Sequence, residues 1–369
     1  MVNPICKRII INATAADRSG ALTILKQFIE NIPIGKYEYL IFINASIRLN
    51  SSNPCVSLEP IQTNGLLKRL SWDLVGLRKY LKNNEIDPVA TISLQNTNFI
   101  SGKLVPNFIY YHNAIPLNDR KWNIFLKKER TLWFYKYLYP FLVRLLINNQ
   151  TEIFVQSNFI KENFARRFNF PDKKIHVIHP DVKLPVSPAS GHTLDSKLVN
   201  LFYPATPFIY KNHKTIIKAL SELDNAKQEK VVLHLTCEKP DLIKIIGDEI
   251  VLFKINFLGS IDFNDIISIY HEADALVFPS FIETIGLPLI EAASVGMKII
   301  VSDLPYSREA LYGYEGATFV VYDNIESWKT EIESLFSKTR EKYMNYKFGK
   351  SDSWDRLFEI IEDRINRNK

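Results

Sequence analysis

The chain has 369 residues and a mass of 42.7 kDa, roughly two to three times the common size of a single domain, which predicts two domains. With 46% hydrophobic and 23% charged residues, the composition is that of a globular protein and excludes disordered, collagen-like or low-complexity architecture. The net charge of +6 fits anionic small molecules or an anionic membrane surface, and it is too weak and too dispersed to indicate nucleic acid.

Targeting and redox signals are sparse in this sequence. Cys6, Cys55 and Cys237 are too few and too widely spaced for a disulfide framework or a zinc site, so we expect a reducing cytosol. The N-terminus lacks the apolar core and cleavage site of a signal peptide. The most apolar stretch, residues 138–147, is short and contains Arg144, whereas a spanning helix needs about 20 apolar residues. We therefore predict a chain that does not cross a bilayer.

In the first half of the chain, short apolar runs alternate with longer helical patterns. Such strands, separated by helices, are typical of a parallel sheet covered on both faces. The predicted strands are residues 8–13, 40–44, 89–94, 107–111, 152–156 and 174–178. The predicted helices are residues 21–32, 64–81, 121–148 and 158–168.

The α/β pattern restarts after residues 183–196, a stretch rich in Pro, Ser and Gly that predicts an interdomain linker. The predicted strands of the second half are residues 198–203, 230–236, 255–258, 275–278 and 298–301. Its predicted helices are residues 212–223, 262–271 and 287–295. The sequence therefore predicts an α/β fold with one domain in residues 1–182 and a second domain in residues 197–350.

A C-terminal helix is expected in residues 351–369. Residues 354–366 are amphipathic, and one broad face is apolar. That face carries Trp354, Leu357, Ile360, Ile361 and Ile365. The pattern leaves open which of the two domains this helix packs against.

Residues 278–292, FPSFIETIGLPLIEA, form the segment with the clearest chemistry. A buried strand leads into a loop with Glu283 and Gly286, and Pro288 suits the first turn of the helix that follows. The loop glutamate, the glycine and the free N–H groups of the helix together predict an anion site with two adjacent carboxylates, Glu283 and Glu291, and a ribose diol suits one of them. The alternative is that Glu291 only complements the helix dipole and Glu283 is a solvated loop residue.

This segment resembles the E-x7-E signature of retaining glycosyltransferases of the GT-B fold, glycosyltransferase family 4 (group 1), through P-S-x-x-E, G-L-P and I-E-A. Residues 203–220, YPATPFIYKNHKTIIKAL, resemble the P-x(n)-K-N-H stretch of that family. Residues 154–182 resemble its strand, Ser, helix and turn. The resemblance implies two Rossmann-like domains that face each other across a cleft.

The resemblance also assigns roles on the donor side. Glu283 would contact hydroxyls of the transferred sugar, Glu291 would hold the nucleotide ribose, and Lys211 would neutralise the donor diphosphate. A lysine near a helix N-terminus stabilises charge that develops on a leaving diphosphate, although a solvated lysine is the alternative. The phosphates or the sugar would approach the backbone closely at four residues, Thr284, Ile285, Gly286 and Leu287.

In the first half of the chain, Ser19 and Gly20 follow the first strand and match the glycine loop of the family, which faces the donor diphosphate and the acceptor and makes Gly20 a donor-binding candidate. Two adjacent glycines are common there, and a plain turn is the alternative. His112 ends a strand and would contact the transferred sugar or the acceptor, unless it is a loop histidine without a role. Ser157 is expected to cap a helix rather than to take part in catalysis.

Two positions depart from the family pattern. Thr206 stands where many members have an arginine before the phosphate-binding lysine, which leaves diphosphate neutralisation to Lys211, backbone amides and a residue of the first domain. The sequence His179-Pro180-Asp181 replaces the P-N-G turn and puts a ligand contact there in doubt.

The predicted helix 121–148 interleaves basic and aromatic residues. This mixture suits an anionic membrane interface at which a lipid-linked acceptor is presented. The alternative is a core helix with a solvated basic face, and Pro140 is expected to bend or break it. The residues concerned are Lys127, Lys128, Arg130, Lys136 and Arg144 with Trp122, Trp133, Phe134, Tyr135, Tyr137, Tyr139 and Phe141.

The resemblance implies a retaining hexosyltransferase that moves a sugar from a GDP- or UDP-sugar to a hydroxyl of a glycan or lipid-linked glycan. It implies O-antigen or capsule biosynthesis at the inner face of the bacterial cytoplasmic membrane, with a cytoplasmic and peripheral location. The chain has no D-x-D metal motif in a suitable context, so we expect metal independence and no cofactor.

Two alternatives remain open at this stage. One is a sugar-nucleotide epimerase of the same fold, and the other is a non-catalytic partner subunit that binds nucleotide sugar or membrane. A nicotinamide dehydrogenase is disfavoured because no G-x-G-x-x-G follows the first strand.

Overall fold

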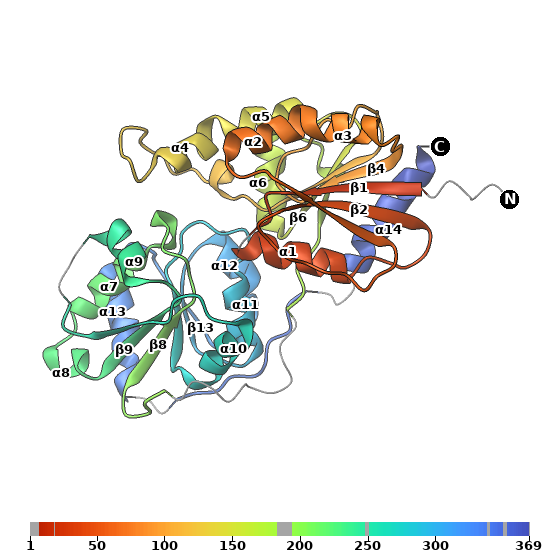
Figure 1. The fold of residues 1–369 in the computed structure, drawn as a ribbon. Helices are drawn as coiled ribbons and strands as arrows, with labels where there is room; N and C mark the ends of the chain where they lie inside the picture. The colour runs from red at the N-terminus through yellow and green to blue at the C-terminus, as the bar shows by residue number, and fades with distance from the viewer. Residues whose placement is uncertain are drawn as a thin grey trace. The chain divides into compact units, whose positions relative to one another are not determined.

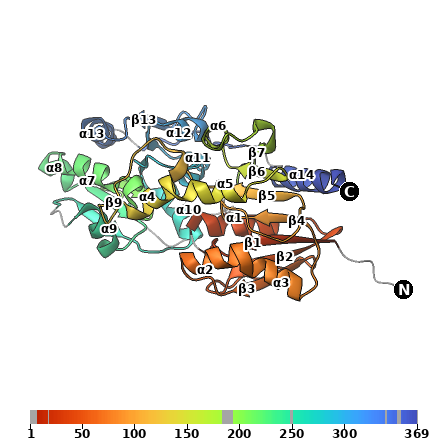
Figure 2. The same cartoon turned by 90° about the horizontal axis from the view of Figure 1, so that it is seen from above.

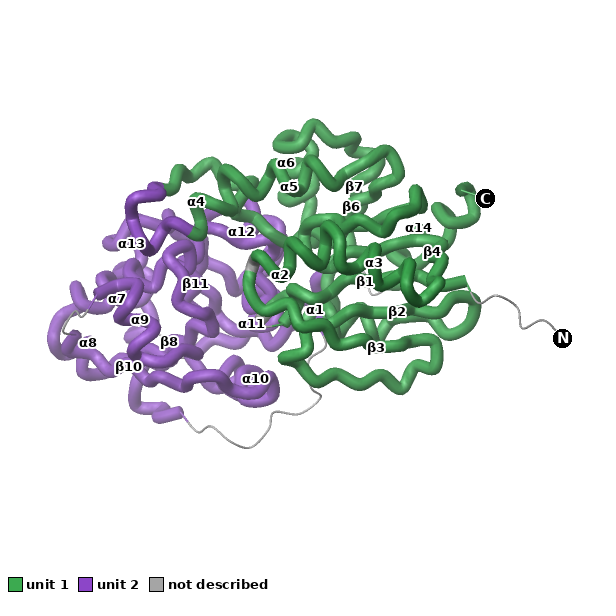
Figure 3. Tube along the Cα trace, turned by 45° about the horizontal axis from the view of Figure 1, so that its top comes forward, with its two compact units in different colours: residues 1–122, 131–181, 349–369 green, residues 123–130, 182–348 purple. Residues whose placement is uncertain are grey.

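The computed structural model describes residues 7–17, 19–182, 194–247, 251–337, 340–349 and 353–368. The chain divides into two compact units (Figure 3). Unit 1 comprises Met1–Trp122, Thr131–Asp181 and Gly349–Lys369, and unit 2 comprises Asn123–Arg130 and Val182–Phe348. Most of the predicted linker, residues 183–193, lies outside the described residues, as does Cys6.

Unit 1 is built on a seven-stranded parallel sheet in the order β3-β2-β1-β4-β5-β6-β7 (Figure 1). Its strands are β1 (Lys7–Ala13), β2 (Tyr37–Asn44), β3 (Val56–Ile61), β4 (Pro88–Ser93), β5 (Asn107–Tyr111), β6 (Thr151–Val155) and β7 (Ile175–Val177). Its helices are α1 (Ser19–Glu30), α2 (Leu66–Ser71), α3 (Leu77–Asn83), α4 (Arg130–Tyr137), α5 (Tyr139–Leu146), α6 (Asn158–Phe168) and α14 (Ser353–Arg367).

The alternation of side chains along β1 builds a core on each face of this sheet. Ile9 and Ile11 belong to a cluster that includes Phe28 of α1 and Trp354 of α14. Ile10 points to the opposite face and packs in a cluster with residues of α3. Both faces are apolar, which explains the nearly continuous hydrophobic strands in the sequence.

Unit 2 contains a six-stranded parallel sheet in the order β10-β9-β8-β11-β12-β13. Its strands are β8 (Val199–Tyr203), β9 (Val231–Leu235), β10 (Lys254–Phe257), β11 (Ala275–Phe278), β12 (Ile299–Ser302) and β13 (Ala317–Val320). Its helices are α7 (His213–Ser221), α8 (Asn225–Gln228), α9 (Lys239–Ile246), α10 (Phe263–Glu272), α11 (Leu287–Ser294), α12 (Pro305–Ala310) and α13 (Ile325–Glu333). The chain thus forms two α/β units, each with a parallel sheet.

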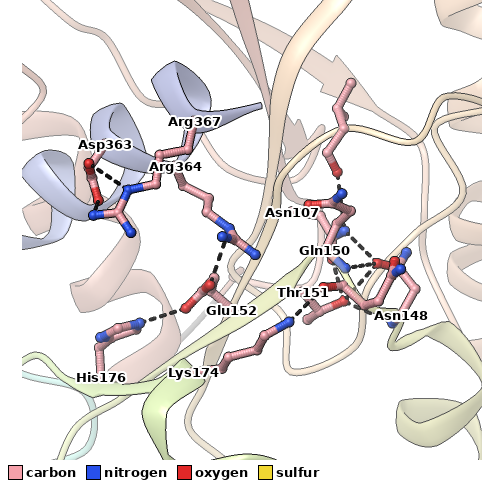
Figure 4. Close-up of polar contacts among 12 residues, drawn as sticks. Asn107, Asn148, Gln150, Thr151, Glu152, Lys174, His176, Asp363, Arg364 and Arg367 are labelled. Carbon is pink, nitrogen blue, oxygen red and sulfur yellow. Dashed lines mark hydrogen bonds and ion pairs between the residues drawn. The ribbon is translucent and has the colours of Figure 1, made fainter. Parts of the chain in front are cut away.

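The C-terminal helix α14 belongs to unit 1 and lies next to β4 (Figure 2). Trp354 stacks on Tyr110 with ring centroids 5.9 Å apart, and its edge meets Phe28. Figure 4 shows a polar anchor farther along the helix, where Arg364 Nε lies 3.3 Å from Glu152 Oε1 and His176 Nε2 lies 2.7 Å from Glu152 Oε2. Apolar packing and ion pairing together fix α14 on unit 1.

The prediction of one long helix over residues 121–148 is wrong. Turns and a bend occupy residues 124–129, and the backbone N–H of Asn123 donates to Glu129 Oε2 at 2.8 Å. The helical part is split into α4 and α5, and Pro140 lies in the first turn of α5, where its missing N–H is tolerated. Residues 123–130 group with unit 2, in which Lys128 Nζ donates to the carbonyl of Ile245 at 3.1 Å.

Among the described helices, none combines the length and the apolar character needed to cross a lipid bilayer. Cys55 and Cys237 are free thiols, and burial raises the pKa of the Cys237 thiol to about 11.

Candidate active site

The donor-side residues gather where the strand order of unit 2 reverses, between β8 and β11. The chain leaves β8 toward β9 on one side and later returns to β11 on the other. Ligands of open parallel sheets bind outside the carboxyl ends of the strands at such a switch point. Lys211 follows β8 and Glu283 follows β11, so the topology brings both to this edge.

Lys211 and Glu283 form a direct ion pair. Lys211 Nζ donates to Glu283 Oε1 at 2.5 Å, and the two side chains are only 19% and 12% exposed. The ammonium also lies 5.7 Å from the ring centroid of Tyr210 and 5.9 Å from that of Phe278. Partial burial against aromatic rings strengthens the attraction between the pair, because little water screens it.

Backbone contacts fix the loop that carries Glu283. The Phe281 N–H donates to the carbonyl of Tyr210 at 2.9 Å, which ties the loop after β11 to the segment after β8. The Tyr306 hydroxyl donates to the carbonyl of Ser280 at 2.7 Å. Asn212, in the left-handed region with φ 56°, donates from Nδ2 to the carbonyl of Tyr322 at 2.9 Å. The pair is therefore held on a loop with fixed geometry rather than on a free surface.

Gly286 precedes α11 with φ 76°, a conformation that favours glycine. A Cβ at this position would lie 3.1 Å from Leu289 Cδ1, so close packing also favours a small residue. The helix begins at Leu287 with a proline in its first turn, as the sequence predicts. Its N-terminal amides and dipole make this end attractive to anions. Thr284 is half-buried and Ile285 is buried in the same loop.

Glu291 lies one turn farther along α11 and has a different partner. Its Oε2 accepts a hydrogen bond from the hydroxyl of Tyr270 of α10 at 3.0 Å. Burial raises the pKa of Glu291 to about 7, and the hydrogen bond from Tyr270 opposes that rise. Within the described residues, no hydrogen bond or ion pair joins Glu291 to Lys211 or Glu283.

His213, beside Lys211 in sequence, is a core residue. It is buried, its ring lies 4.6 Å from the Tyr203 ring, and its Nε2 lies 3.3 Å from the carbonyl oxygen of Ala205. Burial lowers its pKa to about 3. These contacts give His213 a packing role.

His112 lies at the carboxyl end of β5 in unit 1. Its backbone N–H donates to Asn96 Oδ1 at 2.6 Å, and its Nε2 lies 3.4 Å from Asn96 Nδ2. Burial lowers the pKa of His112 to about 4, so the imidazole is neutral at physiological pH. A neutral ring has one donor and one acceptor nitrogen, and the Nδ1 of His112 is buried without a hydrogen-bond partner among the described residues.

Gly20 lies in the first turn of α1 and is exposed. In the described part of the structure, an added Cβ would meet nothing within 4 Å. The fold itself therefore does not require glycine at this position. Ser157 is the N-cap of α6 and accepts a hydrogen bond from the Ile160 N–H at 3.3 Å, which confirms the predicted capping role.

The sequence did not indicate Tyr270, which holds Glu291, because the two residues are far apart in the chain and meet only through packing. One feature of the sequence does indicate further polar residues at a sheet edge. The polar run of residues 95–98 directly follows the predicted strand 89–94, and it carries Gln95 and Asn96 to the same sheet edge as His112. In the described residues, no cluster of three or more His, Cys, Asp or Glu side chains is suited to a metal ion.

Comparison with known proteins gives matches over most of the chain. Residues 192–349 match the family model described as Glycosyl transferases group 1, and residues 45–184 match that described as Glycosyltransferase Family 4. The O-antigen chain mannosyltransferase RfbU of Salmonella typhimurium is 27% identical over 201 residues, which cover 54% of this chain and 55% of that protein. The chain thus spans about half the length of the curated relatives it matches.

Solved structures of glycosyltransferases share the fold. WaaG, a glycosyltransferase involved in lipopolysaccharide biosynthesis, aligns with a TM-score of 0.67 and 10% identity over 90% of each chain. Anabaena Alr3699/HepE in complex with UDP-glucose aligns with a TM-score of 0.63 and 13% identity over 98% of this chain and 97% of that one. With the two family matches and the two parallel α/β units, this likeness shows that the chain belongs to the group 1 glycosyltransferases of family 4 and has the GT-B fold.

Proposed function

We propose that this protein transfers a sugar from a nucleoside-diphosphate donor to a hydroxyl of a glycan or lipid-linked glycan, with retention of anomeric configuration and without a metal ion. The observation that carries the proposal is the Lys211–Glu283 pair, held at 2.5 Å at the switch point of unit 2. A cation and a carboxylate at this edge suit the two ends of an activated sugar, its diphosphate and its hydroxyls.

Each donor-side group has a role in this proposal. Lys211 neutralises the diphosphate, and the amides of residues 284–287 with the N-terminus of α11 bind its oxygens. Glu283 accepts hydrogen bonds from hydroxyls of the transferred sugar. Glu291, oriented by Tyr270, accepts hydrogen bonds from the ribose diol.

The reaction follows from these roles. The bond between the anomeric carbon and the phosphate oxygen breaks, and its electron pair goes to the leaving diphosphate. The acceptor oxygen bonds to the same carbon on the same face, and the acceptor proton passes to the leaving diphosphate. Lys211 stabilises the negative charge that develops on that group, a contribution of the kind that commonly lowers a barrier by about 3–4 kcal/mol. Neutral His112 contacts the sugar or the acceptor.

The O-antigen relative supports a glycan acceptor of the surface-polysaccharide type, and HepE, solved with UDP-glucose, supports a nucleotide-sugar donor. UDP-sugars and GDP-sugars are the two classes of donor proposed for this chain. Both belong in the substrate panel.

Membrane association is part of this proposal. Trp122 and Tyr139 are buried, so part of the aromatic segment forms core, as the alternative reading holds. Phe141 and Leu145 of α5 are 70% and 74% exposed, and Arg144 lies between them in sequence. Exposed apolar and basic side chains on one short helix fit an anionic lipid surface. Flotation with vesicles that contain anionic lipid should recover the wild type, and a Phe141→Ser/Leu145→Ser variant should float less.

The direct test is transfer by the purified protein, with UDP- and GDP-sugars and a panel of glycan acceptors, in the presence of EDTA. We expect a product whose anomeric proton shows the configuration of the donor by NMR. Conversion of the nucleotide sugar without acceptor would support an epimerase instead. Donor binding without turnover across the panel would support a non-catalytic subunit. Inversion, or complete loss of transfer in EDTA, would contradict the proposed mechanism.

A further inference from the structure

A buried polar network lies at the carboxyl edge of the unit 1 sheet, and Asp73 is its centre. Asp73 is 4% exposed and belongs to a π-helical turn, Trp72–Gly76, between α2 and α3. Its Oδ1 accepts hydrogen bonds from Asn12 Nδ2 and from Gln95 Nε2, both at 2.7 Å. Isolated π-helical turns within helices are frequent at functional sites.

The network spans the point where the strand order of unit 1 reverses. Asn12 belongs to β1 and Gln95 follows β4, and these neighbouring strands flank the reversal. Asp73 thus joins the two strand ends at the place where open parallel sheets bind ligands.

Gln95, which donates to Asp73, also accepts hydrogen bonds from the loop between β1 and α1. Its Oε1 accepts hydrogen bonds from the Ala15 N–H at 3.1 Å and from Thr14 Oγ1 at 3.2 Å. The far side of the same loop is tied by Asp17, whose Oδ2 lies 2.8 Å from Arg69 Nη2. This loop leads directly to Gly20.

Asn96, the neighbour of Gln95, is hydrogen-bonded to His112. Its backbone has φ 69°, the left-handed region that asparagine tolerates better than most residues. Its Oδ1 accepts the His112 N–H, and the carbonyl of neighbouring Gln95 accepts the Tyr139 hydroxyl at 3.3 Å. The turn formed by Gln95 and Asn96 therefore connects Asp73 to both candidate features of unit 1, the loop that leads to Gly20 and His112.

A buried carboxylate is costly to keep, and here two amide donors compensate that cost. Burial raises the pKa of Asp73 to about 7, while Asn12, Gln95 and the charge of Arg69 oppose the rise. An apolar residue at this position would need no such compensation, so stability alone does not explain an aspartate here.

We propose that Asp73 is a positioning residue that sets, through Gln95 and Asn96, the placement of the β1–α1 loop and of His112 against a hydroxyl-bearing saccharide. The inference rests on the proposed glycosyl transfer, in which the loop faces the donor diphosphate and the acceptor and His112 contacts the transferred sugar or the acceptor. Asp73 itself is buried and does not touch substrate in this account.

The test combines an activity readout with one that is independent of activity. In Asp73→Asn, which keeps the shape of the side chain but loses its charge, we expect faster amide hydrogen exchange at Ala15 and His112. Exchange in unit 2 should be unchanged, while kcat should fall roughly 10- to 100-fold, as misplacement of reacting groups does. The matched control is Asp87→Asn, which removes an exposed carboxylate of the same unit that pairs with Lys103. Unchanged exchange at both amides would overturn the inference.

A second variant covers the case in which Asp73→Asn fails to fold. Asn96→Gly keeps the left-handed backbone accessible and removes only the link to His112, so exchange at His112 should rise while exchange at Ala15 stays as in the wild type. Asn169→Gly, a left-handed asparagine at the exposed end of α6, is its control. Normal kcat and normal exchange at His112 in Asn96→Gly would overturn the inference. A wild type without transfer activity would contradict the proposed function, whereas the exchange data would still decide whether Asp73 fixes these two features.

Discussion

The Lys211–Glu283 pair is the residue-scale feature on which the donor site depends. Each side chain neutralises the charge of the other, with 2.5 Å between Lys211 Nζ and Glu283 Oε1. In the proposed donor complex, the diphosphate would pair with the lysine and the sugar hydroxyls would donate hydrogen bonds to the carboxylate. Both charges thus stay compensated throughout the cycle, which matters because an unpaired charge in a partly buried site is strongly destabilising.

Replacing Lys211 by methionine should remove most of the catalysis. The substitution keeps the apolar stem but deletes the cation, so kcat should fall by about 10²–10³-fold. Initial rates at saturating donor measure this effect. Lys218→Met, which changes an exposed lysine of α7, is the matched control and should leave the rate unchanged. Near-wild-type kcat in Lys211→Met would rule out the assigned role.

The raised pKa of Glu291 predicts a pH dependence of stability. Because its pKa is about 7 in the fold against an ordinary value of 4.5, the folded state binds the proton more tightly than the unfolded state. Ionisation of Glu291 therefore lowers the free energy of unfolding progressively between about pH 4.5 and 7, by up to about 3 kcal/mol above that range. Denaturant titrations at pH 5 and pH 8 should show Glu291→Gln gaining stability relative to wild type at the higher pH. The same difference at both values would contradict the shift.

Glu291 also predicts how nucleotide affinity changes with pH. An ionised carboxylate accepts hydrogen bonds from the ribose diol more strongly, so the affinity of the wild type for UDP or GDP should rise as pH increases through about 7. Glu291→Gln reports the titration of the phosphate alone and serves as the control in calorimetric titrations. Parallel pH curves for the two proteins would argue against a ribose contact.

Gly20 offers a test that separates folding from ligand approach. A Cβ meets nothing within 4 Å in the described structure, and alanine is favoured over glycine in helices by up to about 1 kcal/mol. Gly20→Ala should therefore keep or slightly raise the melting temperature while lowering transfer, because the methyl group would intrude on a ligand close to the backbone. Full activity in this variant would identify the segment as a plain turn.

The sequence predicted the local parts of this site better than its long-range parts. Glu283, Gly286 and Glu291 lie within nine positions of one another, so a single loop and helix turn specify their spacing, whereas their partners Lys211 and Tyr270 come from other segments. The partnership of Asp73 with Asn12 and Gln95 joins residues 61 and 22 positions apart and emerges only when β1 and β4 pair. No hydrophobic periodicity in the sequence predicts the hydrogen bonds of Asp73 with Asn12 and Gln95.

At the scale of elements, the helix α14 shows that an amphipathic pattern predicts a helix but not the surface on which it packs. The predicted apolar face is buried at Trp354, Leu357, Ile361 and Ile365, whereas Ile360 is only partly buried and Phe358 joins the core. The pattern identified the helix, but the choice of unit 1 depends on Phe28, Tyr110 and Glu152, which lie far away in sequence.

Truncation of Trp354 should destabilise unit 1 strongly. Its ring is buried between Phe28 and Tyr110, and loss of a buried aromatic side chain typically costs about 3–5 kcal/mol. Denaturant unfolding of Trp354→Ala, followed by circular dichroism, measures the loss. Arg356→Ala, an exposed position on the same helix, should change stability by no more than about 0.5 kcal/mol. Equal effects of the two substitutions would contradict the packing described for α14.

Two elements differ from the sequence prediction because local features oppose the overall pattern. The helical periodicity of residues 121–148 is interrupted by side-chain contacts to the backbone at Asn123 and by Pro140. The strand β3 was missed because it lies at the edge of the sheet, is only partly buried and contains Pro60, so its apolar pattern is weak.

At the scale of the whole molecule, the chain forms two α/β units, and its C-terminal helix returns to the first. Each unit has a parallel sheet with a switch point, and the candidate residues of each unit lie at that carboxyl edge. The candidates Lys211, Glu283, Gly286 and Glu291 belong to unit 2. Gly20, predicted to face the donor diphosphate and the acceptor, and His112, predicted to contact the transferred sugar or the acceptor, belong to unit 1. This division fits a glycosyltransferase in which both units contribute residues that bind the substrates.

A crystal structure of the protein with a bound UDP- or GDP-sugar tests the central claim most directly. We predict density for the diphosphate beside Lys211 and the N-terminus of α11, the ribose hydroxyls on Glu291, and the sugar hydroxyls on Glu283. A nucleotide sugar bound away from these three side chains would contradict the account.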